Sequence, residues 1–140
     1  MPFHRFYTPH GLYTPEEKRA IAEAITQIYT RLPKFYVVVN FINIDDGDFF
    51  VGGEKNNNFL RILVHHYAYH TEDPAWKRAW MDKYEKAIEP WTKDKGLDWE
   101  VQISNADNVF WNQNGMAPPP FESEAFNLWK AENKAIPYSL

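Results

Sequence analysis

The chain has 140 residues, a net charge of −4 at pH 7 and no cysteine. This length suits one domain and is enough to bury about two thirds of the surface of the unfolded chain. The negative charge and the lack of a basic stripe argue against a nucleic-acid partner, because nothing would neutralise the phosphates. Without cysteine, neither a disulfide framework nor thiolate chemistry is expected.

No association with a membrane is expected either. The sequence has no run of about 18 apolar residues, and its N-terminus lacks the apolar core of a signal peptide. We therefore expect a cytoplasmic protein. Aromatic residues make up 17% of the chain. Since aromatic side chains are enriched in cores, interfaces and ligand pockets, we expect extensive buried surface that is shared between subunits.

The first elements of the chain are predicted to be a strand and a helix. Residues 3–7 have the composition of a short strand. Thr14 can cap the following helix, with Pro15 at its first position and Glu17 completing a capping box. Apolar residues then recur at helical spacing until Pro33, which is expected to end the helix.

A second strand follows, and the order of elements then repeats. Residues 35–44 are apolar and mostly β-branched, which is typical of a strand buried on both faces. Residues 59–67 read as a strand, Asp73 and Pro74 start another amphipathic helix, and residues 99–103 read as the last strand.

The chain therefore reads as two tandem β-α-β units, over about residues 2–44 and 59–104, within one domain spanning 1–140. Because each unit is right-handed, the two side by side form a four-stranded sheet with both helices on one face, an α/β (α+β) fold. The tail over 105–140 adds a proline-rich stretch and a short C-terminal helix. The strand that ends the first unit is apolar on both faces, so we expect subunit association to bury the uncovered face.

Pro2 has the most distinctive chemistry of any residue in the sequence. Removal of Met1, which a small second residue such as proline allows, leaves a secondary amine at the N-terminus. Reference α-amino groups titrate near pH ~8, and desolvation or a nearby cation lowers that pKa. Such an amine can act as a general base or as a nucleophile that forms an iminium. If Met1 is retained, the proline nitrogen belongs to an amide and can act neither as a base nor as a nucleophile. In that case Met-Pro would merely begin a strand.

Charged and imidazole side chains supply further candidates. Arg61 lies in an otherwise apolar strand, where it either holds a substrate carboxylate or enolate or forms a salt bridge at the strand end. His65 and His66 face opposite sides of a strand, and His66 and His70 would lie roughly 13 Å apart at ~3.3 Å per residue. One zinc ion cannot span that distance, so we expect no metal and no cofactor. His70, just after the strand, is a candidate for proton transfer.

Uncharged polar and aromatic residues complete the candidate set. Tyr29 and Tyr69 can donate hydrogen bonds to a substrate oxygen or simply pack as rings. Gln102 and Asn114 are polar in apolar surroundings, so each needs a partner, which is either a ligand or the backbone. Trp111 is expected to wall a pocket or to pack in the core or an interface.

Several segments together resemble the tautomerase superfamily. They are the strand-first start at Met1-Pro2 and residues 24–29, 39–41, 50–53 and 114–121. In this order they are similar to the subgroup around cis-3-chloroacrylic acid dehalogenase, and most to its fungal relatives labelled as oxalocrotonate tautomerases. The resemblance implies a fold like that of macrophage migration inhibitory factor and a homotrimer. It also implies a pocket near each N-terminal proline, completed by a neighbouring subunit, for proton transfer at enols or hydration of small unsaturated acids.

At most of the dehalogenase's other functional positions, this chain has a different residue. Its helix histidine falls at Tyr29, and its two carboxylate-binding arginines fall near Tyr69 and Glu72. The tyrosine and glutamate that activate water fall near Gln102 and Gln113. Dehalogenation by that route is therefore not expected.

The sequence predicts a tautomerase or isomerase that carries out proton transfer or hydration on a small enol or unsaturated acid. Pro2 would move the proton, and Arg61, which matches an arginine typical of the fungal relatives, or tyrosine hydroxyls would hold the substrate oxygens. Two alternatives stay open. One is a trimeric binding protein that has lost the chemistry, and the other is a biosynthetic lyase or cyclase that uses the pocket without the proline.

Overall fold

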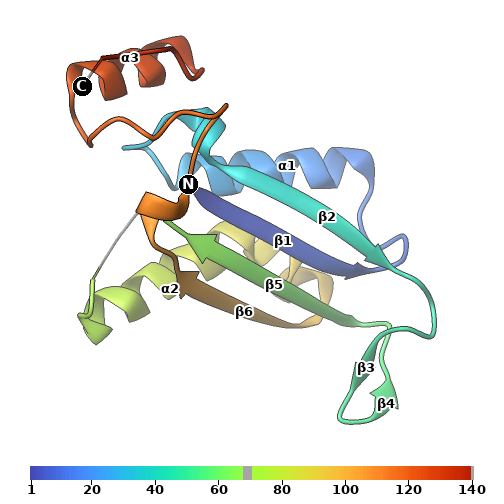
Figure 1. Cartoon of the computed structure of the whole chain (residues 1–140). Helices are drawn as coiled ribbons and strands as arrows, with labels where there is room; N and C mark the ends of the chain where they lie inside the picture. The colour runs from blue at the N-terminus through green and yellow to red at the C-terminus, as the bar shows by residue number, and fades with distance from the viewer. Residues whose placement is uncertain (68–70, 140) are drawn as a thin grey trace.

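The computed structural model describes residues 1–67 and 71–139. Its main sheet has the strand order β2-β1-β5-β6, with β1 and β5 antiparallel at the centre and a parallel strand on each side (Figure 1). The strands are β1 (Pro2–Pro9), β2 (Val38–Ile44), β5 (Phe59–His66) and β6 (Asp98–Asn105). Two short strands, β3 (Phe50–Val51) and β4 (Glu54–Lys55), pair as a separate hairpin.

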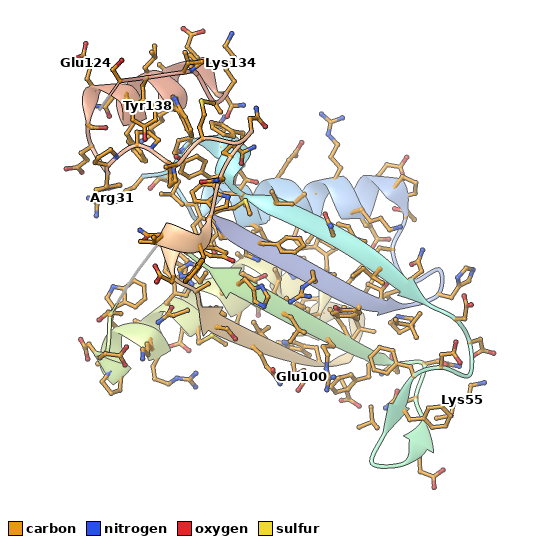
Figure 2. All side chains as sticks on the ribbon, in the orientation of Figure 1. Arg31, Lys55, Glu100, Glu124, Lys134 and Tyr138 are labelled. Atoms are coloured by element: carbon orange, nitrogen blue, oxygen red, sulfur yellow. The ribbon has the colours of Figure 1, made fainter. Side chains whose placement is uncertain are left out.

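Helices α1 (Pro15–Gln27) and α2 (Pro74–Ile88) lie on the same face of the sheet (Figure 1). The predicted fold of two β-α-β units with both helices on one face is therefore confirmed. The predicted C-terminal helix is α3 (Glu124–Glu132), which lies at the end of the molecule opposite the β3–β4 hairpin (Figure 2). No helix in the described residues is long and apolar enough to cross a membrane.

Local sequence explains where the two long helices begin. The Thr14 hydroxyl accepts a hydrogen bond from the Glu17 backbone N–H at 3.1 Å, and Pro15 takes the first helical position. The Asp73 carboxylate accepts from the Ala75 N–H at 3.0 Å in the same way. Both starts agree with the predicted caps.

Proline also decides where the regular elements stop. Helix α2 ends at Ile88 because Pro90 has no N–H to donate and its ring clashes with the preceding turn. The chain continues through the 3₁₀ turns η2 (Glu89–Trp91) and η3 (Lys93–Lys95). The strand expected over 35–44 begins only at Val38, because the chain after Pro33 forms the 3₁₀ turn η1 (Lys34–Tyr36). Helix α1 ends at Gln27, before Pro33, since the next amides bond three residues back.

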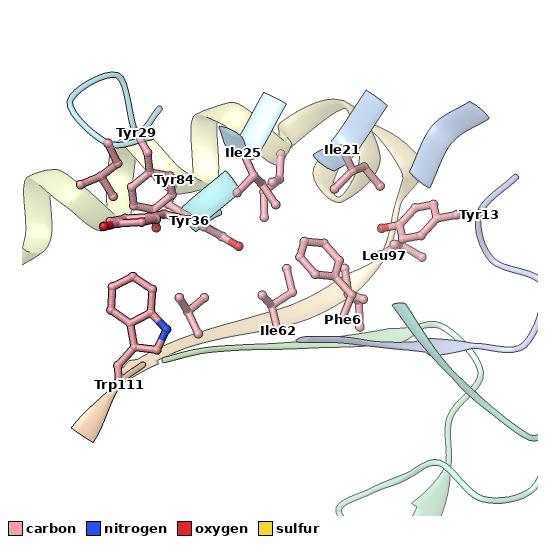
Figure 3. Packing of buried hydrophobic residues seen from close by; sticks show 14 of the residues in the cluster. Phe6, Tyr13, Ile21, Ile25, Tyr29, Tyr36, Ile62, Tyr84, Leu97 and Trp111 are labelled. Carbon is pink, nitrogen blue, oxygen red and sulfur yellow. The ribbon is translucent and has the colours of Figure 1, made fainter. Parts of the chain in front are cut away.

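The core lies between the sheet and the two helices (Figure 3). Alternate residues of the central strands point into it, including Phe6 of β1 and Ile62 of β5, and both are fully buried. Ile21 and Ile25 of α1 pack against them from the helix side.

The opposite face of the sheet is covered by no described helix. The residues that alternate with the core positions point there, and several are apolar and only half-buried: Phe3, Tyr7, Val38, Ile42 and Leu63. The expectation that β2 is apolar on both faces agrees with this arrangement.

Candidate active site

Pro2 is buried at the start of β1, directly opposite His66 at the end of β5. The Tyr67 N–H donates to the Met1 carbonyl at 3.2 Å, so Met1 and Tyr67 face each other as a hydrogen-bonded pair. Because hydrogen-bonded and non-hydrogen-bonded pairs alternate along an antiparallel ladder, the next pair, Pro2 and His66, exchanges no backbone hydrogen bonds. A proline fits there because no ladder hydrogen bond is lost. The two side chains share one face, and the Cβ atoms of such a pair lie about 4.5–5.5 Å apart.

Aromatic rings surround the His66 imidazole. The His66 ring centroid lies 5.7 Å from that of Tyr29 and 5.5 Å from that of Trp80. Tyr29 follows α1, is only 2% exposed and also lies 5.7 Å from the ring of His4. A second buried imidazole, that of His4, bonds through Nδ1 to the Tyr84 hydroxyl at 2.8 Å. The structure therefore gathers one candidate, Tyr29, beside the buried end of β1.

Burial keeps both imidazoles and the N-terminal amine uncharged near neutral pH. It lowers the pKa of His66 from 6.5 to about 4, with a further contribution from the positive charge of the N-terminal amine. The pKa of His4 falls to about 3 because of burial and the neighbouring His66. Burial also lowers the pKa of the Met1 α-amine from 8.0 to about 5. An amine at Pro2 would lie in the same desolvated environment.

Because these histidines are buried and uncharged, we expect the protein to lose stability in mild acid. The folded pKa values lie below the unfolded value of about 6.5, so only the unfolded chain gains protons as the pH falls through 6.5. The free energy of unfolding should drop by about 2–3 kcal/mol between pH 7.5 and pH 5.5, with the N-terminal amine acting in the same direction.

Urea unfolding at several pH values measures this loss. The His66→Gln variant should show a visibly shallower pH dependence than the parent protein, since one of the two histidines no longer titrates. Equal free energies of unfolding at pH 7.5 and 5.5 in the parent protein would contradict the prediction.

A pocket of about 360 Å³ opens beside this cluster, between α2 and the ends of β5 and β6. His66 and Trp80 form its inner wall, and Asn105 lies on the β6 side. Lys77 and Arg78 of α2 bring two cations to the pocket. Lys77 also pairs with the exposed Glu72 carboxylate at 3.1 Å. The pocket thus combines aromatic surface, one imidazole and positive charge, which suits a small organic acid.

A larger groove of about 880 Å³ lies between α1 and α3. It includes Tyr29 but neither histidine of the buried cluster. Arg19 and Lys130 of this groove are engaged, since Arg19 pairs with Glu23 at 3.0 Å and Lys130 donates to the Thr30 carbonyl at 3.0 Å. The smaller pocket is the better candidate because His66 connects it to Pro2.

Arg61 does not join Pro2 within one subunit. It lies five residues before His66 on β5, about 16 Å away at ~3.3 Å per residue. Its guanidinium donates to the carboxylate of Glu100 on the neighbouring β6 strand. Of the two interpretations of Arg61, the structure shows the salt bridge.

The remaining predicted residues lie apart from the buried cluster. Gln102 is exposed on the uncovered face of the sheet, opposite Leu63. Gln113 and Asn114 belong to a tight turn, in which the Gln113 N–H donates to the Met116 carbonyl at 2.8 Å. Asn114 adopts a φ of 51°, a conformation that asparagine tolerates in turns.

Three other predicted residues are aromatic or lie outside the described part of the chain. Trp111 is buried and packs edge-on against Tyr36, with ring centroids 4.8 Å apart, so the structure shows its packing role. Tyr69 and His70 lie outside the described residues.

The burial of His4 and His66 beside Pro2 was not predicted from the sequence. A signal for both was present, because Pro2, His4 and Phe6 alternate along one strand and must share a face. The cations Lys77 and Arg78 were missed because nothing in a charged helix distinguishes a pocket wall from a solvated surface.

Comparison with known proteins identifies the family. Residues 1–134 match the family described as "putative oxalocrotonate tautomerase enzyme". The chain belongs to this family. The predicted membership of the tautomerase superfamily is therefore confirmed, and with it a relationship to enzymes of this class.

Two solved structures are similar to this tautomerase-family chain over nearly its whole length. RhCC from Rhodococcus jostii RHA1 is 39% identical, with a TM-score of 0.93 and coverage of 97% of this chain and 99% of that chain. A "probable enzyme" from the thermophilic fungus Aspergillus fumigatus is 34% identical, with a TM-score of 0.92 and coverage of 99% and 98%. A bacterial protein is thus as similar as a fungal one, and the comparison does not single out the fungal relatives.

More distant structures share the fold alone. N1, a member of the cis-3-chloroacrylic acid dehalogenase family, is 17% identical with a TM-score of 0.72, covering 93% of this chain and 96% of that chain. A fused 4-OT, solved as an asymmetric trimer, is 18% identical with a TM-score of 0.66, covering 82% and 94%. No functionally curated protein matches the chain.

Proposed function

We propose that this tautomerase-family chain is an enzyme that moves a proton on a small 2-oxo or enol acid, with Pro2 as the N-terminal base after removal of Met1. The observation that carries the proposal is the position of Pro2, buried at the first residue of β1 and opposite His66. Desolvation in this environment lowers the pKa of an amine, so that a useful fraction is unprotonated at neutral pH.

The substrate acid is expected to bind with its carboxylate toward α2. Lys77 and Arg78 supply positive charge in the pocket lined by His66. Arg61, the other candidate for the carboxylate, lies five residues from His66 along β5 and its guanidinium bonds to Glu100. The aromatic walls exclude water, which strengthens each charged contact with the substrate.

The predicted effect of these cations is on substrate binding. Lys77→Met and Arg78→Met should each raise KM about tenfold and leave kcat nearly unchanged, because a carboxylate contact stabilises the bound substrate and the transition state alike. Lys86→Met is the matched control, since Lys86 lies near the other end of α2 and pairs with Glu89. Unchanged KM in both variants would place the carboxylate elsewhere.

The assembly is proposed to be a homotrimer. The uncovered face of the sheet carries half-buried apolar residues such as Phe3, Tyr7 and Leu63, and association is the simplest way to remove them from water. The fused 4-OT that shares this fold was solved as a trimer.

The direct test is ketonisation of 2-hydroxymuconate and of the enol of phenylpyruvate. The protein must have an N-terminus verified by mass spectrometry, and sedimentation of the same sample gives its mass relative to the 16.6 kDa chain. Rates above the uncatalysed reaction support the proposal, and a sample with free Pro2 that gives no rate would refute it.

A catalytically inactive binding protein, or a lyase or cyclase that does not use the proline, is the second candidate. The observation that favours it is that Gln102, a predicted substrate contact, faces away from the pocket. The resemblance to the dehalogenase also implies a tyrosine, Tyr29, in place of its helix histidine. Intact Met1 in protein from the native source would support this candidate.

A further inference from the structure

His66 connects the proposed base to the proposed substrate pocket. Of the described residues, it alone both pairs with Pro2 across the sheet and lines the pocket of about 360 Å³. Its side chain is 2% exposed in the monomer, so a ligand that reaches the inner wall meets the imidazole in a nearly dry environment.

We propose that His66 is a second catalytic residue, which donates a hydrogen bond from its neutral imidazole to the enolate oxygen of the substrate. The ligand class is a 2-oxo acid and its 2-hydroxy enol. This inference rests on the proposed function of Pro2 and adds the group that stabilises the charge formed when the proton leaves carbon.

Pro2 alone carries the proton in this reaction. The unprotonated Pro2 amine takes a proton from the carbon beside the carbonyl, and the C–H electron pair becomes the new C=C bond. The π electrons of the C=O bond move onto the oxygen, which gives an enolate and a prolinium. The imidazole N–H of His66 stabilises this oxygen, and the prolinium then returns the proton to it. The enol and the free amine result, and His66 keeps its proton throughout.

The surroundings of His66 favour a neutral donor over an imidazolium. Burial of the ring is the larger cause of the lowered pKa of His66, and the N-terminal amine on β1 acts in the same direction. Tyr29 after α1 and Trp80 of α2 cover the ring.

A neutral imidazole is well suited to this role. A preorganised donor in a site without water stabilises developing negative charge without reorganisation, and one such donor is typically worth about 10²–10³ in kcat. Triosephosphate isomerase provides the precedent for a neutral histidine of lowered pKa that polarises a carbonyl. An imidazolium would instead raise the cost of forming the prolinium next to it.

His4 does not compete for this role. It is fully buried, does not line the pocket, and its Nδ1 is engaged with the Tyr84 hydroxyl at 2.8 Å. His65 also differs, because it points to the uncovered face, where its Nε2 lies 3.0 Å from the Arg5 guanidinium. His65 is therefore a matched control of the same residue type one position away.

The experiment compares His66→Leu, His66→Gln and His65→Gln in trimer-competent, full-length protein with a verified N-terminus. His66→Leu should lower kcat for ketonisation by about 10²–10³, with KM within about threefold of the parent protein. His66→Gln retains an N–H donor and should recover kcat to within about tenfold of the parent. His65→Gln should match the parent.

A second measurement does not depend on the folding of a variant. Nitrogen-15 NMR of the parent protein should show His66 as a neutral imidazole at pH 6, and oxalate, which resembles the enolate of a 2-oxo acid, should shift its N–H signal. A folded His66→Leu protein with kcat within twofold of the parent, or an imidazolium signal at pH 6, would overturn the assignment.

The two proposals fail in different ways. If Pro2→Ala is inactive while folded His66→Leu is fully active, only the role of His66 is refuted. If Pro2→Ala retains full activity, the proposed function of Pro2 is refuted first.

Discussion

Replacing Pro2 by alanine is expected to lower kcat/KM for ketonisation by about 10²-fold or more. A positioned general base contributes about this much to proton transfer. Alanine leaves a primary amine after removal of Met1, and this amine lacks the ring that fixes the nitrogen at the start of β1. Because the pair formed by Pro2 and His66 has no ladder bonds, the variant should fold like the parent protein.

Steady-state kinetics on the variant and the parent, each with its N-terminus confirmed by mass spectrometry, measures this effect. Parent protein that retains Met1 is the natural control, since an amide nitrogen cannot accept the proton and activity should fall to background. Equal activity of the Pro2→Ala and parent proteins would end the proposal that Pro2 is the base.

Replacing Trp129 by alanine should cost about 3–5 kcal/mol of the free energy of unfolding, the range for removing a buried aromatic side chain. Trp129 is fully buried on α3, and its Nε1 donates to the Ile136 carbonyl at 2.7 Å. Its ring packs against Phe35 and Tyr138, with centroids 5.9 Å away in each case. The substitution therefore removes both a large apolar contact and the hydrogen bond that fixes the C-terminal tail.

Urea unfolding measures this loss. Leu128→Ala on the same helix is the control, because Leu128 is 44% exposed and its replacement should change stability by less than about 1 kcal/mol. A Trp129→Ala protein as stable as this control would show that α3 contributes little to the fold.

The tail also reaches the candidate site through a chain of aromatic contacts. Tyr36 lies between Trp129 and Trp111, with ring centroids 6.3 Å and 4.8 Å away. Trp111 lies 6.3 Å from Tyr67, whose backbone N–H bonds the Met1 carbonyl. Loosening α3 is therefore expected to reduce the order of the N-terminal end of β1, where Pro2 lies.

The elements of this fold could be predicted from local patterns. Helix starts depend on side chains next to the helix, and Thr14 and Asp73 cap α1 and α2 as their positions predict. The order of strands and helices, together with the right-handedness of β-α-β units, then leads to one sheet with both helices on one face. Element ends were less predictable, since the 3₁₀ turn after Pro33 and the one that contains Pro90 are indicated by no apolar pattern.

Pro2 as the starting residue of a strand was determined by the sequence alone, and so was the family to which the chain belongs. The composition of the site was decided by tertiary structure. Whether His66 or Arg61 lies beside Pro2 depends on the register between β1 and β5, which joins residues far apart in the chain. Local sequence does not contain this register; it is set when alternate residues of both strands enter the same core. That packing brings His66 to Pro2, leaves Arg61 with Glu100, and lowers the pKa of the groups around the N-terminus by burying them.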